Sequence, residues 1–74
     1  MQLSKDTKLR DLLAAYPWLI DEAVKIDRRL GILRSPFGRA LISRADVAEA
    51  ARRMGLTSEE VIEKVEELIA EHEA

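Results

Sequence analysis

The 74-residue sequence contains no cysteine, a single histidine, and only one tryptophan, one tyrosine and one phenylalanine. Without cysteine, the chain can form neither a disulfide nor a thiolate metal site. The one histidine, His72, cannot by itself supply a transition-metal site within one chain. We therefore expect no metal and no cofactor.

The sequence also has no long apolar run. No stretch approaches the ~18 consecutive apolar residues that a membrane-spanning helix needs. The first residues, Met1–Asp6, do not combine a basic region with an apolar core as a secretory signal peptide does. We expect a cytoplasmic protein with no membrane association.

Residues suited to catalysis are scarce. No cysteine is present, His72 is isolated, and no serine or threonine is near a plausible base. The paired carboxylates Glu59–Glu60 and Glu66–Glu67 fall on or beside the solvated face of an expected helix. Catalytic carboxylates need burial or close pairing to shift their pKa values, and a solvated face provides neither. We expect that the protein is not an enzyme.

Helical periodicity dominates what is present. Apolar residues recur at helical spacing along most of the chain, and no segment alternates with the period of a strand. Four helices are predicted: one capped by Asp6 or Thr7 and running to Ala15, then Pro17–Leu30 (ended by Gly31), Arg44–Met54 and Ser58–His72. Ser35 and Pro36 predict a further short helical turn through Leu41. The expected fold is all-α, a compact bundle of four helices plus a short helical turn, in a single helical domain over residues 1–74.

The start signals of the last two helices are the clearest local feature. In Ser43–Asp46 and Thr57–Glu60 a hydroxyl precedes a carboxylate by three residues, the spacing of a capping box. Between the two helices, Gly55 supplies the left-handed residue that ends many helices. Helix, glycine turn and helix match the outline of a DNA-binding helix-turn-helix. The second helix carries seven glutamates against Lys64, however, and phosphate would repel it, so we do not expect nucleic-acid binding.

Charge is distributed unevenly along the chain. From Lys25 to Arg44 there are six basic residues against Asp27 alone, whereas from Ala45 onward there are nine carboxylates and three bases. This distribution has two interpretations. Either the basic and acidic regions attract each other within one molecule, or the basic region forms a patch that binds an anion or an acidic partner.

The segment between Gly31 and Ser43 holds the candidate site. It combines large apolar side chains with arginines and contains neither lysine nor glutamate, a composition typical of interface cores. We identify Arg34, Phe37 and Arg39 as the candidate interaction patch. The alternative is that the apolar side chains of this segment only close one end of a small core.

The order of motifs resembles a known family. The relevant stretches are Asp6–Leu13, Tyr16–Pro17, Ala45–Ala51 and Gly55–Val65. Together they are similar to the small helical domain-of-unknown-function family eighteen fifty-eight, related to the N-terminal domain of iron–sulfur repair proteins. Many members carry a cysteine pair before the third helix and are described as redox-disulfide domains. The corresponding segment, Leu33–Ser43, has no sulfur, so the resemblance implies a cysteine-free branch, no redox role, and an accessory or interaction function.

These observations predict a non-enzymatic protein-interaction or accessory domain that self-associates, with a homo-oligomer or another protein domain as the partner. The alternative is a regulatory domain that binds a small anion or nucleic acid through its arginines. The two differ in whether Arg28, Arg29, Arg34, Arg39 and Arg44 form one face left uncovered by the acidic last helix.

Overall fold

The protein is all-α, and a computed structural model describes residues 1–73. The elements in chain order are α1 (Leu9–Ala15), α2 (Leu19–Ile26), the 3₁₀ helix η1 (Arg28–Arg34), α3 (Pro36–Arg44), α4 (Val47–Met54) and α5 (Ser58–Glu73). Across these residues there is no strand, only an isolated antiparallel bridge between Lys8 and Asp46. The all-α prediction is confirmed, but the expected four helices plus a turn are wrong, because six helices form.

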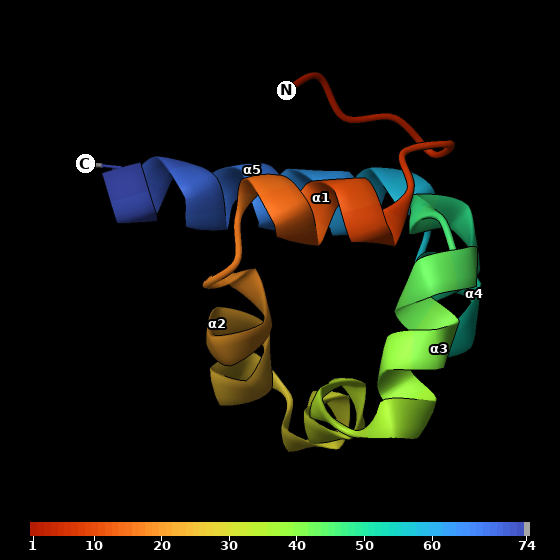
Figure 1. Cartoon of the computed structure of the whole chain (residues 1–74). Helices are drawn as coiled ribbons and strands as arrows, with labels where there is room; N and C mark the ends of the chain where they lie inside the picture. The colour runs from red at the N-terminus through yellow and green to blue at the C-terminus, as the bar shows by residue number, and fades with distance from the viewer. Residues whose placement is uncertain (74) are drawn as a thin grey trace.

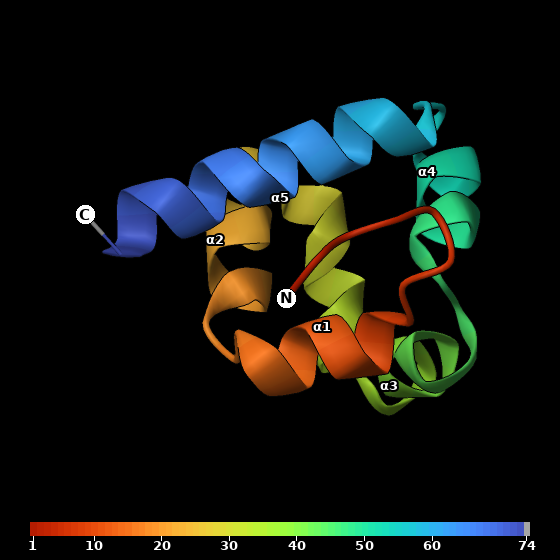
Figure 2. The ribbon, with the colours of Figure 1, turned by 90° about the horizontal axis from the view of Figure 1, so that it is seen from above.

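The helices outline a rough square in one view (Figure 1). α1 and α5 run in the same direction along one edge, α2 and η1 form two further edges, and α3 with α4 closes the fourth. Seen from above, the N-terminal segment crosses the space between α1 and α5 (Figure 2). The core is small and consists of six buried residues: Leu12, Leu19, Ile42, Ala45, Val47 and Ala51. No described residue of α5 is fully buried, although its apolar stripe is half-buried.

The predicted helix over Pro17–Leu30 is divided into two. Pro17 and Trp18 form a turn, and α2 ends at Ile26 because Asp27 adopts an extended backbone. The Asp27 carboxylate then accepts a hydrogen bond from the Arg29 amide at 3.0 Å and starts η1. Gly31, the predicted stop, lies inside η1 without a positive φ.

The predicted turn at Pro36–Leu41 is a full helix, α3, that continues to Arg44. Its start follows the prediction: Ser35 Oγ accepts from the Gly38 amide at 3.1 Å, and Pro36 occupies the first turn. The same hydroxyl donates to the Ile32 carbonyl at 2.6 Å, so one side chain joins η1 to α3.

The predicted cap of the third helix is wrong by three residues. Ser43 lies within α3 and donates to the Ala40 carbonyl at 2.8 Å, while Asp46 is the cap of α4 and accepts from the Glu49 amide at 2.9 Å. α4 therefore begins at Val47, not at Arg44.

Backbone from the N-terminal segment completes the start of α4. The Val47 amide donates to the Thr7 carbonyl at 2.9 Å, and the Ala48 amide donates to the Lys5 carbonyl at 3.0 Å. In return, the Leu9 amide at the start of α1 donates to the Ala45 carbonyl at 3.0 Å. The segment that precedes each helix thus supplies acceptors for unpaired first-turn amides of the other helix. α1 has no side-chain cap, so the predicted cap by Asp6 or Thr7 is wrong.

The junction of α4 and α5 follows the prediction closely. Gly55 has a φ of 72°, the left-handed conformation, and the Leu56 amide donates to the Ala51 carbonyl at 2.9 Å. The Gly55 amide also donates to Arg52, which completes a Schellman motif. Thr57 Oγ1 then accepts from the Glu60 amide at 3.1 Å and caps α5.

Candidate interaction surface

The candidate residues Arg34, Phe37 and Arg39 lie where η1 meets α3. The apolar side chains of this segment divide between core and surface. Ile42 is buried, Leu33 and Leu41 are half-buried, and the two others remain outside: Phe37 is 64% exposed and Ile32 52% exposed. We call Ile32, Arg34, Phe37 and Arg39 the corner surface.

The backbone beneath the corner surface is closely packed. Gly38 is buried, and a Cβ placed on it would overlap the Ile32 carbonyl and the Leu33 Cα. α3 can approach η1 this closely only because residue 38 has no side chain. Together with the two hydrogen bonds of Ser35, this contact fixes the angle at which Ile32 and Phe37 are displayed.

The two arginines of the corner surface differ in their partners. Arg34 Nη2 lies 2.5 Å from Asp21 Oδ1, and this ion pair links the end of η1 to α2. For Arg39, residues 1–73 supply no ion pair and no side-chain hydrogen bond. Arg39 is exposed on the first turns of α3, two residues after Phe37 and therefore on a different side of the helix.

A second ion pair neutralises the start of η1. Arg29 donates to both oxygens of the Asp27 carboxylate, the shortest contact being 2.7 Å from Nη2 to Oδ2. The Arg29 side chain, and then its backbone amide, hold the pKa of the Asp27 carboxyl below its ordinary value. Arg29 is thus paired with the residue that caps its own helix, and Arg34 with a carboxylate of α2.

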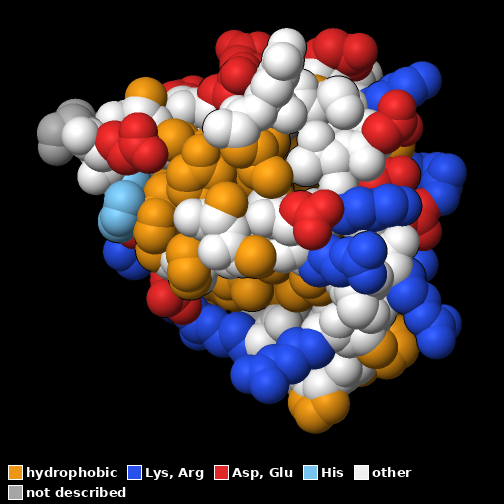
Figure 3. Space-filling view, turned by 45° about the horizontal axis from the view of Figure 1, so that its top comes forward, with side chains coloured by type: hydrophobic (Ala, Val, Ile, Leu, Met, Phe, Trp, Pro, Cys, Tyr) orange, Lys and Arg blue, Asp and Glu red, His pale blue; other side chains and the backbone are white. Residues whose placement is uncertain are grey.

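The acidic helix α5 does not neutralise the basic segment. Within the described residues, no ion pair joins α5 to residues 25–44, and the glutamates of α5 pair only through Lys64 and Glu67 at 3.4 Å. The two regions therefore do not form the intramolecular pairing that one reading of the sequence suggested. Figure 3 shows Lys and Arg side chains along the right and lower edges of the view, with Asp and Glu side chains among those on the right.

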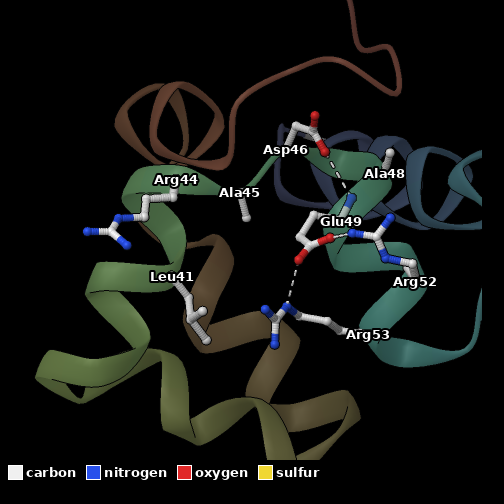
Figure 4. A pocket seen from close by; sticks show the side chains of 8 residues that line it. All are labelled: Leu41, Arg44, Ala45, Asp46, Ala48, Glu49, Arg52 and Arg53. Carbon is white, nitrogen blue, oxygen red and sulfur yellow. Dashed lines mark hydrogen bonds and ion pairs between the residues drawn. The ribbon is translucent and has the colours of Figure 1, made fainter.

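A groove of about 500 Å³ lies in the bend between α3 and α4 (Figure 4). We call it the arginine groove; it is lined by Leu41, Arg44, Ala45, Asp46, Ala48, Glu49, Arg52 and Arg53. Glu49 Oε1 lies 3.2 Å from Arg53 Nε, and Glu49 Oε2, which is buried, contacts Arg52 Nη2. The Arg44 guanidinium points away from Glu49, and residues 1–73 offer it no ion pair.

Sequence reasoning did not place Arg44, Arg52 and Arg53 around one groove. The available signal was the spacing of Arg52 and Arg53 three and four residues after Glu49, which puts all three on one helix face. The bend that brings Arg44 to the same groove depends on Ala45, whose burial has no local signature.

His72, the lone histidine, stacks on Trp18 with ring centroids 3.8 Å apart and planes 15° from parallel. Tyr16 meets the same indole edge-on at 5.9 Å. These contacts join the last turn of α5 to the turn before α2, and sequence reasoning did not find them. Residues 1–73 contain no cluster of three or more metal-ligating side chains.

Within residues 1–73 no helix combines the length and the apolar character needed to cross a lipid bilayer. Comparisons with known protein families, with functionally characterised proteins and with solved structures find no match to this chain. The resemblance drawn from the sequence therefore stays a prediction.

Proposed function

We propose that this chain is a non-enzymatic protein-interaction domain that self-associates through the corner surface. The observation that carries the proposal is the exposure of Phe37 and Ile32 on a closely packed backbone corner. Side chains of this size are usually buried in a small domain when the fold has room for them. Here the core is filled by other residues, and the largest apolar side chain of the segment faces outward.

The surroundings of Phe37 suit a protein partner. Aromatic residues and arginine are enriched at interface cores, and lysine and glutamate are depleted. Arg34 and Arg39 lie within three residues of Phe37 in the sequence, and no lysine or glutamate lies between Gly31 and Ser43. Because Gly38 and Ser35 hold the backbone, association requires little ordering of the chain, which lowers its entropic cost.

The alternative, an anion or nucleic-acid site over the arginines of residues 28–44, is less well supported. Two of those five arginines, Arg29 and Arg34, are already engaged with Asp27 and Asp21. A phosphate backbone would have to compete with these carboxylates, and the segment offers no row of aromatic side chains for base stacking.

Sedimentation velocity over a concentration series tests the proposal. The wild type is expected to show a sedimentation coefficient that rises with concentration, whereas Phe37→Glu stays monomeric because a carboxylate replaces the apolar centre of the interface. Ile26→Glu is the matched control, since Ile26 is 55% exposed at the end of α2, outside the corner surface.

Circular dichroism and thermal melting establish that each variant is folded. A wild type that remains monomeric at the highest attainable concentration contradicts the proposal. Equal association of the Phe37→Glu protein and the wild type contradicts it as well, because the corner surface would then have no part in self-association.

A further inference from the structure

The charges of this molecule are separated between two regions that do not pair with each other. Residues 28–54, which contain η1, α3 and α4, hold seven arginines against two carboxylates, a net charge of +5. α5 holds seven glutamates against one lysine, a net charge of −6 with its histidine neutral. Within residues 1–73 no ion pair links them, so both remain available to another molecule.

The arginine groove is the concave surface of the positive region, and its lining holds three arginines against Asp46 and Glu49, a net charge of +1. Glu49 holds Arg52 and Arg53 in place, and Asp46 is occupied as the cap of α4. Arg44 has no carboxylate partner among the described residues. The groove therefore keeps an excess of guanidinium groups, two of which are already oriented before a ligand arrives.

The groove is continuous with the corner surface. Phe37, Leu41 and Arg44 are spaced four and three residues apart along α3, so they lie on the same face of that helix. Leu41 lines the groove and Phe37 stands one turn before it. A partner in the groove would thus meet guanidinium groups at one end and an exposed aromatic ring at the other.

The outer face of α5 has the matching chemistry. Glu59, Glu63 and Glu66 follow one another at intervals of four and three residues and are all exposed. None of them takes part in an ion pair within residues 1–73. A row of carboxylates along a helix of 16 residues is long enough to meet several guanidinium groups at once.

We infer that α5 of a second copy docks in the arginine groove, with its carboxylate row against Arg44, Arg52 and Arg53. The inference rests on the proposed self-association and defines its geometry. The two surfaces are different parts of the chain, so the contact is heterologous. One copy of the pair then has a free groove and the other a free α5, so the assembly grows into a chain or closes into a ring.

Two variants that each block one surface test this arrangement. Arg44→Glu reverses the charge of the groove and should repel α5 of any copy. The double variant Glu63→Gln, Glu66→Gln removes two negative charges from α5. It adds no positive charge, so it gains no attraction to the groove of the Arg44→Glu protein. Each variant alone should sediment as a monomer at concentrations where the wild type associates. An equimolar mixture should form a one-to-one heterodimer, because one copy supplies an intact α5 and the other an intact groove.

The matched control is Glu22→Gln, which removes a carboxylate from α2 instead of α5 and should associate as the wild type does. Association of the wild type should weaken as ionic strength rises, because screening shortens the reach of charges to about 3 Å at 1 M.

A mixture of the two variants that remains monomeric overturns the inference, because only a contact between unlike surfaces is complemented in this way. Full association of the Glu63→Gln, Glu66→Gln protein overturns it too, since the groove would then bind something other than α5. In either case loss of association in Phe37→Glu leaves the proposed function standing. Unchanged association in Phe37→Glu counts against the proposed function itself.

Discussion

A single hydrogen atom in place of a side chain determines how η1 and α3 pack. We predict that Gly38→Ala destabilises the fold by ~1–3 kcal/mol, the usual cost of forcing extra volume into a packed site. The added methyl would overlap the backbone at Ile32 and Leu33, which cannot rotate away as a flexible side chain would. Chemical denaturation monitored by circular dichroism measures the change in the free energy of unfolding.

Gly31→Ala is the matched control. A Cβ at Gly31 meets nothing within 4 Å, and its φ is not positive. This variant should be neutral or more stable by ~0.4–1 kcal/mol, because alanine restricts the unfolded chain. Similar stabilities for the two variants would contradict the close contact between α3 and η1.

From the sequence, Gly31 was expected to be the structurally important glycine of this segment, and the structure shows that it is Gly38. Gly31 was predicted as a helix stop, because glycine often follows the last residue of a helix. The glycine that matters is Gly38, which sits where two elements cross. A crossing point depends on three-dimensional packing, and no local pattern in the sequence records it.

Among the elements, α5 begins with the clearest cap. We predict that Thr57→Ala lowers the free energy of unfolding by ~0.5–2 kcal/mol, because the Glu60 amide loses its acceptor. Ser43→Ala is the control, since Ser43 lies inside α3 and bonds only to the carbonyl of Ala40. Alanine favours a helix interior, so Ser43→Ala should be near neutral. Thermal midpoints compare the two, and an unchanged midpoint in Thr57→Ala would show that Thr57 does not stabilise α5.

Helix boundaries were predictable where the signal lies within a few residues. Ser35 with Pro36, Gly55 and Thr57 all act as their sequence context indicates. The start of α4 had a local signal that was overlooked, since Asp46 precedes Glu49 by three residues and accepts from its amide. The acceptors that Lys5 and Thr7 supply to the Val47 and Ala48 amides, some forty residues earlier in the chain, were not predictable. The Ser43 hydroxyl predicted the wrong start for α4, because Ser43 lies inside α3 and donates to the Ala40 carbonyl.

The candidate site, like the helix boundaries, could be predicted from the sequence only in part. The aromatic and arginine content of the corner surface could be read from composition. The exposure of Phe37 could not, because the sequence left open that this side chain closes one end of the core. The arginine groove could not, because Arg44 and Arg52 belong to different helices and meet through the bend at Ala45.

For the molecule as a whole, charge separation argues against DNA recognition. α4, the glycine turn and α5 have the order of a helix-turn-helix, yet Ser58, Glu59 and Glu60 occupy the start of the second helix. Reading helices usually carry base-contacting cations or amides there. We predict no sequence-selective, submicromolar binding to duplex DNA. Fluorescence anisotropy with pooled duplexes at physiological salt measures the binding. Sequence-selective binding at submicromolar affinity would favour the nucleic-acid function over the protein-interaction function.

The pairing of the N-terminal segment with α4 also has a consequence for solvent exchange. Amides in the first turn of a helix commonly exchange their hydrogens rapidly, because no carbonyl of the same helix protects them. Here Val47 and Ala48 donate to Thr7 and Lys5, so their hydrogens exchange only when the segment detaches. These two amides therefore report how often the two distant parts of the chain separate, independently of whether α4 itself unwinds.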